Sequence, residues 1–134
     1  MSLAELGRLL VTLASLLPGP ARGQPAVDWT TAQQVDVLMV DDRFVPDHLT
    51  FQRGTPYRLL LKNAGKDLHE FTAPAFFADA ILRDPGILAQ NGKEIVVQPD
   101  AEVYVYLMLV RAGTFELTCA DHDWDGMVGE IVVD

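Results

Sequence analysis

Short apolar runs separated by turn residues dominate the chain from residue 34 onwards. Runs of about 4 to 8 residues that are rich in Val, Ile, Thr, Tyr and Phe are typical of β-strands. We expect strands at 35–40, 49–51, 57–62, 94–98, 103–110, 114–119 and 128–133, and a short extended piece at 67–72. The run 103–110 is apolar on both faces, which is typical of a central strand.

One segment departs from this β pattern. Residues 75–83 follow Pro74 and place apolar side chains at helical spacing, and Asp84 and Pro85 end the pattern. We therefore expect one short helix here, whereas the turn-rich stretch 41–47 is expected to be a connection. About eight short strands with regularly spaced turn signals predict an all-β fold, a Greek-key β-sandwich.

The N-terminal region has a different pattern. An apolar run at 9–17 follows Arg8 and ends at a Pro-Gly-Pro break, and small residues precede position 24. This pattern is typical of a secretory signal peptide, and the run is too short for a membrane anchor. We expect residues 1–23 to be cleaved and residues 24–134 to form a single domain in the periplasm or another exported location. The alternative is a short amphipathic helix at the N-terminus.

The balance of charge narrows the possible partners. The chain has 19 acidic and 10 basic residues and a net charge of −9. Such a surface repels nucleic acid and anionic lipid and favours cationic partners. We therefore expect no nucleic-acid binding, and the acidic surface favours a soluble monomer.

Candidate chemistry is concentrated in one predicted loop, at 119–127. Cys119, His122 and Met127 bring a thiolate, an imidazole and a thioether within nine residues. This set suits copper, whose trigonal site takes two histidines, one cysteine and a weak axial methionine. Calcium and magnesium require oxygen ligands, and structural zinc usually takes paired cysteines or histidines. Cys119 is the only cysteine, so it has no disulfide partner in the chain.

A trigonal site needs a second histidine from outside this loop. His69 is the best candidate, because it lies at the end of a predicted strand that a sandwich can bring beside the loop. His48 lies in a polar segment near a strand start and is expected at the surface.

The spacing of these residues resembles the cupredoxin family. The chain has Cys-x2-His-x4-Met after a Gly-Thr-Phe-x-Leu-x strand, an upstream histidine, and a loop spacing similar to that of pseudoazurins. Residues 44–54 and 126–133 are similar to the early and closing strands of the family, and the resemblance covers about residues 34–134. It implies a mononuclear copper centre held by His69, Cys119 and His122 in the trigonal plane, with Met127 as the axial ligand.

Two positions depart from the family pattern. Cupredoxins commonly have Asn after the first histidine, where this chain has Glu70, and Ala120 lacks the hydroxyl often found after the cysteine. Residues around the ligands orient and tune a metal. In the related nitrosocyanins a carboxylate is a copper ligand. Met127 argues against that arrangement here, and Glu70 stays open as an auxiliary ligand.

Two further features of the loop have alternative interpretations. Trp124 either packs inward or forms part of a hydrophobic docking surface beside the copper. Asp121, Asp123 and Asp125 either keep the loop soluble, or they lower the reduction potential and steer a basic partner.

The function expected from the resemblance is one-electron transfer between Cu(II) and Cu(I). The implied partner is a redox protein with a basic docking surface, such as a c-type cytochrome or a copper enzyme. No nucleophile–base pair or paired acid is evident, and we expect the protein not to be an enzyme. The main alternative is a periplasmic copper-handling protein, for buffering, tolerance or delivery, with the same fold and ligands. A third is a metal-free binding module.

Overall fold

The computed structural model describes Gly19 and residues 26–134, which form two five-stranded sheets packed face to face. The strands are β1 (Gln33–Val40), β2 (Arg43–Val45), β3 (His48–Phe51), β4 (Pro56–Asn63), β5 (His69–Thr72), β6 (Ala80–Leu82), β7 (Glu94–Val97), β8 (Glu102–Leu109), β9 (Gly113–Thr118) and β10 (Val128–Val133). One α-helix, α1 (Pro74–Ala78), and three short 3₁₀ helices, η1 (Trp29–Thr31), η2 (Pro85–Ile87) and η3 (Asp123–Asp125), complete the described elements. The predicted signal peptide lies outside the described residues, apart from Gly19.

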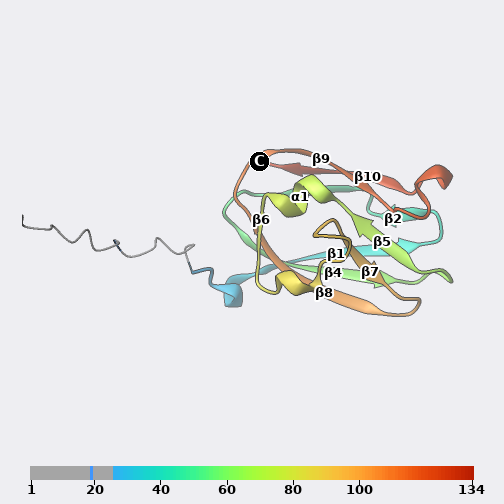
Figure 1. Cartoon of the computed structure of the whole chain (residues 1–134), viewed down its shortest axis with the longest axis horizontal. Helices are drawn as coiled ribbons and strands as arrows, with labels where there is room; N and C mark the ends of the chain where they lie inside the picture. Colours follow the sequence, from blue (N-terminus) through green and yellow to red (C-terminus); the bar gives the residue numbers. More distant parts are fainter. Residues whose placement is uncertain (1–18, 20–25) are drawn as a thin grey trace, which may run out of the picture.

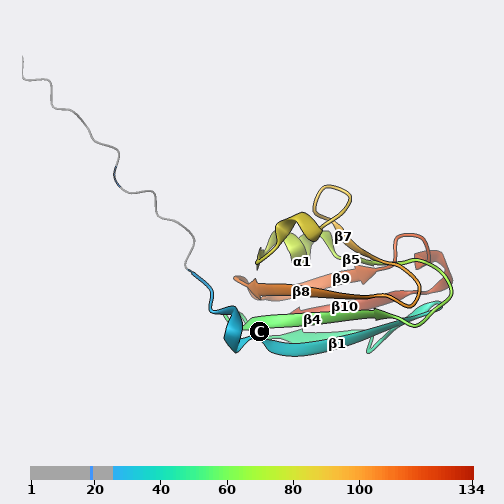
Figure 2. The same cartoon turned by 90° about the horizontal axis from the view of Figure 1, so that it is seen from below.

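The two sheets have the orders β2-β1-β4-β8-β6 and β3-β10-β9-β5-β7. Figure 2 shows β1, β4 and β8 of the first sheet side by side. β1 pairs with β4 and β3 pairs with β10 in parallel, whereas the other pairings are antiparallel. The predicted all-β sandwich with one short helix is confirmed. None of the described helices is long and apolar enough to cross a membrane.

The structure differs from the sequence-based prediction at two short strands, which bring the number of strands in the described part of the chain to ten. Residues 43–45, expected within a connection, form β2 and pair with β1. The predicted helix over 75–83 is wrong in its second half, because α1 ends at Ala78. Residues 80–82 instead pair with β8 at an edge of the first sheet. A short apolar run fits a helix or a strand equally well, so the pairing with β8 decides its conformation.

β8 is also less buried than its apolar run predicted. Val105, Leu107 and Leu109 point into the core, but Tyr104 on the opposite face is 46% exposed. The guanidinium of Arg58 lies 5.3 Å from the centre of the Tyr104 ring, and that of Arg83 lies 3.6 Å from the Tyr106 ring. Arginines stacked on the tyrosines therefore take the place of a second apolar layer.

The core between the sheets is rich in aromatic rings. α1 begins at Pro74, a residue that suits the first position of a helix, and directs Phe76 into the core. The Phe76 ring lies 5.4 Å from Phe51 and 5.9 Å from Phe115, so the helix contacts strands of the second sheet. Side chains packed in this way resist displacement and provide a stiff frame for the loops.

The loop between β4 and β5 and the loop between β9 and β10 lie at the end of the sandwich opposite the C-terminus (Figure 1). β5 and β9 are antiparallel neighbours, with Thr72 opposite Thr118. Because both are the last residues of their strands, the start of β5, at His69, lies beside the residues that follow β9, the first of which is Cys119. The topology therefore brings together two residues that are fifty positions apart in the sequence.

Candidate metal centre

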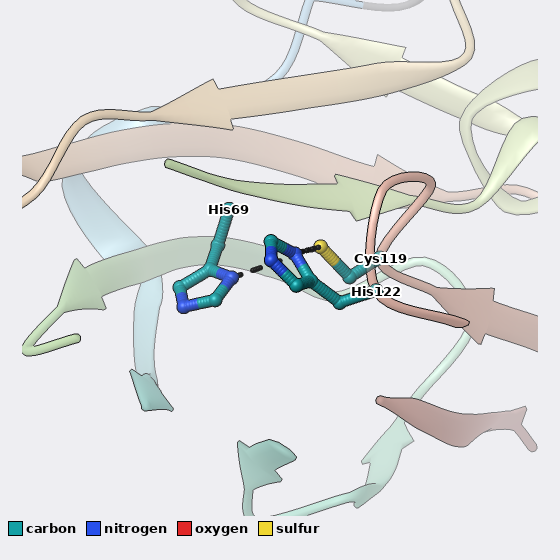
Figure 3. Close-up of side chains that lie close together, drawn as sticks. All are labelled: His69, Cys119 and His122. Atoms are coloured by element: carbon teal, nitrogen blue, oxygen red, sulfur yellow. Dashed lines mark hydrogen bonds between the residues drawn. The ribbon is translucent and has the colours of Figure 1, made fainter. Parts of the chain in front are cut away.

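Three candidate ligands converge in this structure. The Nδ1 atom of His69 lies 3.8 Å from Cys119 Sγ, and the Nδ1 atom of His122 lies 3.4 Å from the same sulfur. The ligand atoms of all three residues lie within 4.8 Å of one another. Figure 3 shows the two imidazole rings and the sulfur facing one another. One metal ion between these atoms would be in reach of all three.

Backbone hydrogen bonds fold the loop that carries Cys119, His122 and Met127. The Cys119 N–H donates to the Met127 carbonyl at 3.0 Å, and the Met127 N–H donates to the His122 carbonyl at 3.2 Å. Gly126 permits the turn between them, because its φ of 88° is strained for other residues. Met127 is fully buried, and its assignment as the axial ligand stays a prediction.

Each imidazole presents Nδ1 to the sulfur and Nε2 to an aspartate. His69 Nε2 lies 3.2 Å from Asp41 Oδ1, which also accepts a hydrogen bond from the Lys66 N–H at 3.0 Å. That N–H, followed by His69, lowers the pKa of Asp41 below its ordinary value. On the other side, His122 Nε2 lies 3.9 Å from Asp67 Oδ2, which is beyond hydrogen-bond distance.

Glu70 occupies the position where the family commonly has Asn, and it contacts the sulfur directly. Its N–H donates to Cys119 Sγ at 3.3 Å, and the thiol donates to its Oε2 at 3.0 Å. The residue is only 5% exposed, and burial raises the pKa of its carboxyl. Glu70 is not in the group whose ligand atoms lie within 4.8 Å of one another. Glu70 therefore contacts the sulfur but does not belong to the three residues whose ligand atoms converge.

The thiol itself is held in its protonated form in the metal-free chain. Burial, followed by the Glu70 side chain, raises the pKa of Cys119 to about 12. A metal must displace this proton, because the thiolate is the form that binds metals. A soft, strongly binding cation such as copper can do so.

The donor set fits copper better than other common metals. One thiolate and two imidazoles match the trigonal plane of a copper site, whereas calcium and magnesium would require oxygen ligands. Of the three converging donors, His69 and Cys119 are fully buried and His122 retains 17% of its side-chain exposure. The centre is therefore enclosed, with one imidazole edge at the surface.

The structure tests one expectation from the sequence and decides one question that the sequence left open. His48 lies at the surface, 3.5 Å from Glu130, as predicted. Trp124 points outward and is 79% exposed, and its indole N–H donates to the Asp121 carbonyl at 3.0 Å. Its inward-packed alternative is wrong.

The sequence analysis missed Asp41, which contacts a ligand ring from 28 positions upstream. It also missed Gly65. A Cβ there would lie 2.3 Å from Asp41 Oδ1 and 2.8 Å from His69 Nε2. The turn residues around both positions are a general signal of loops, so they did not indicate contact with the centre.

Comparisons with known proteins agree with this geometry. The chain matches the cupredoxin-like domain family over residues 9–133. The copper-resistant cuproprotein CopI of Pseudomonas aeruginosa is 33% identical over 97 residues, which cover 71% of this chain and 49% of CopI. The chain thus spans about half the length of this relative.

Solved structures share the fold at low sequence identity. Auracyanin B has a TM-score of 0.60 at 19% identity, over 81% of this chain and 93% of auracyanin B. Reduced auracyanin of Roseiflexus castenholzii has a TM-score of 0.58 at 14% identity, over 78% and 98% of the two chains. A multicopper oxidase of Campylobacter jejuni has a TM-score of 0.60 at 15% identity, over 83% of this chain and 31% of the oxidase.

The converging His69, Cys119 and His122 agree with the family match and with the copper-protein relative. Copper is the cofactor that these three findings support. The chain belongs to the cupredoxin family and is a copper-binding protein.

Proposed function

We propose that the protein transfers single electrons at a copper centre held by His69, Cys119 and His122, with Met127 as the axial ligand. The observation that carries this proposal is the unequal burial of the ligands. His69 and Cys119 are fully buried, and His122 alone of the three converging donors is partly exposed, at 17%. Burial disfavours rapid exchange of the metal, whereas an exposed imidazole edge gives an electron a short route to the surface.

The frame around the centre suits this role. Copper supplies the Cu(II)/Cu(I) couple when bound, and the two states prefer different geometries. Ligands held by a packed sandwich and a hydrogen-bonded loop change little between the states, which lowers the rearrangement needed for each transfer. The proposal is for an electron carrier, with no catalysis of its own.

The surface around His122 supports a cationic partner. Asp121, Asp123 and Asp125 are exposed in the ligand loop, and Trp124 projects between them. We propose a redox partner with a basic docking surface, such as a c-type cytochrome or a copper enzyme, met by a monomer outside the cytoplasm. The signal-peptide pattern in residues 1–23 supports a periplasmic location.

Voltammetry and kinetics of the copper-loaded protein test this function. We expect a reversible one-electron wave, fast reduction by a cationic cytochrome c, and retention of copper through many oxidation cycles. His122→Ala, which removes the exposed edge, should slow the cytochrome reaction, and exogenous imidazole that refills this ligand position should recover the rate. An irreversible wave, or copper loss at each cycle, would contradict electron transfer.

Copper handling is the second candidate, because the relative CopI is described as copper-resistant. The buried ligands also suit sequestration of copper, which needs tight binding and no redox partner. Expression in a copper-sensitive bacterium distinguishes the two. Protection by the native chain that is lost in Cys119→Ala, with slow electron transfer in vitro, would favour copper handling.

A further inference from the structure

His69 lies outside the loop of residues 119–127, and both of its ring nitrogens have a close partner. The ring is fully buried, and its Nδ1 faces Cys119 Sγ at 3.8 Å. Its Nε2 faces Asp41 Oδ1 at 3.2 Å. A neutral imidazole has one N–H and one lone pair, so the partner of one nitrogen determines the role of the other. An N–H at Nε2 would leave the Nδ1 lone pair directed toward the ligand sulfur.

Asp41 is held in place independently of His69. It follows directly after β1, and its Oδ1 accepts the Lys66 N–H at 3.0 Å. In the same turn, the Gly65 N–H donates to Asn63 Oδ1 at 2.9 Å, and the Asn63 amide donates to the Asp67 carbonyl at 2.8 Å. The carboxylate is thus fixed by backbone that does not depend on the histidine.

Gly65 leaves the room that this contact needs. A Cβ at this position would lie 2.3 Å from Asp41 Oδ1 and 2.8 Å from His69 Nε2, distances that real Cβ atoms do not show. Its φ lies outside the left-handed range, so the restriction is the space occupied by the Asp41–His69 pair.

We propose that Asp41 is a positioning residue of the copper centre, which fixes the tautomer of His69 and stabilises Cu(II) relative to Cu(I). A carboxylate that accepts the second N–H of a ligand histidine orients the ring and raises its basicity. A more basic, partly anionic imidazole favours the more highly charged metal ion. This inference deepens the proposed function and rests on the copper centre, so it holds for electron transfer and for copper handling alike.

The chain supplies matched controls. Asp67 lies beside the other ligand ring, but at 3.9 Å from His122 Nε2 it makes no hydrogen bond. Asp42 is the exposed neighbour of Asp41, and its positive φ of 68° is well tolerated by Asn. Asp67→Asn and Asp42→Asn each remove one negative charge near the centre without removing the contact to His69.

The test compares these controls with Asp41→Asn and Asp41→Ala, both expected to fold because Asp41 is 44% exposed. In the metal-free protein, ¹⁵N NMR of His69 should show the Nε2–H tautomer in the native chain and a mixture of tautomers in Asp41→Ala. Asp41→Asn keeps an oxygen acceptor and should keep the tautomer.

With copper, competition with chelators gives a Kd for each oxidation state. Asp41→Ala should weaken Cu(II) binding about 10- to 100-fold and Cu(I) binding less. Asp41→Asn should lose part of the Cu(II) preference, and the two controls, which remove charge without the contact to His69, should lose less of it. An unchanged tautomer in Asp41→Ala, or equal effects of the controls, would overturn the proposal. Absence of copper binding in the native chain would contradict the copper centre. The NMR result would still show whether Asp41 fixes the tautomer of His69.

Discussion

At Cys119, burial and one neighbouring carboxyl act in the same direction on the thiol. The sulfur is fully buried, and Glu70 Oε2 lies 3.0 Å away. A thiolate at this place would lack solvation and would face a negative group when Glu70 is ionised. The metal-free site is therefore neutral at the sulfur, with a pKa of about 12. Copper binding must release the thiol proton.

Glu70→Gln tests the contribution of that carboxyl. The amide keeps the size of the side chain and removes its charge, so we expect the pKa of Cys119 to fall while burial still holds it above its ordinary value. Ultraviolet thiolate absorbance of the metal-free protein gives the comparison, over the pH range in which circular dichroism shows the fold intact. Equal thiolate fractions in both proteins at every pH would contradict this effect of Glu70.

The candidate ligands could be predicted from the sequence because their residue types and spacing are specific. Cys119, His122 and Met127 lie in one loop, and the combination of a thiolate, an imidazole and a thioether favours copper. Asp41 could not be identified in this way, because an aspartate in a turn has many roles and only the fold brings it to His69. The orientation of Trp124 was open for a similar reason, since a loop tryptophan has no periodic pattern.

At the level of the elements, one backbone position shapes the loop of residues 119–127. The 3₁₀ helix η3 ends at Asp125 and is followed by Gly126, whose φ is 88° and whose Cβ position has no neighbour within 4 Å. The restriction at Gly126 is therefore conformational, since a methyl group would meet open space.

Gly126→Ala should destabilise the metal-free protein by about 1 kcal/mol, the cost of placing an L-residue in the left-handed region. Gly86→Ala is the matched control, because Gly86 also has open space around its Cβ position but lacks a positive φ. Its effect should be near zero. Urea unfolding followed by fluorescence measures both, and similar losses in the two variants would argue against a conformational cause.

The helix α1 should be important for the core despite its single turn and a half. Phe76 is fully buried and packs on Phe51 and Phe115. Phe76→Ala should therefore cost about 3 to 5 kcal/mol of unfolding free energy. Tyr104→Ala, at a half-exposed ring of β8, should cost much less. A small loss for Phe76→Ala would show that the helix is dispensable to the core.

Most strands could be predicted from the sequence, because alternation and turn residues mark a half-buried strand well. β10 begins and ends as predicted at Val128 and Val133, and other predicted strands differ at their ends by one or two residues. β2 and β6 have three residues each, too few for a period to show. Their conformation depends on pairing with β1 and β8, which is tertiary information.

For the whole molecule, the sandwich presents the metal end as an acidic surface on a chain of net charge −9. The ligand loop contributes three exposed aspartates beside the edge of His122. A surface of one sign raises the encounter rate with a partner of the opposite sign and loses this effect at high salt.

Replacing Asp121, Asp123 and Asp125 together with Asn should slow reduction by a cationic cytochrome c several-fold at low ionic strength and raise the reduction potential. A second triple variant, Asp84→Asn, Glu116→Gln and Asp134→Asn, removes the same charge outside the loop. Stopped-flow rates over a range of salt compare the two. If both variants slow the reaction equally, net charge is responsible and the loop is not a docking surface.

The central claim is a copper–thiolate centre, and the visible absorption spectrum tests it most directly. One equivalent of Cu(II) added to the purified protein should produce an intense blue or green thiolate-to-copper band. Mild reductant should bleach the band, and Cys119→Ala should abolish it while the protein stays folded. A colourless protein with weak copper absorption would contradict the assembly of His69, Cys119 and His122 around one copper ion.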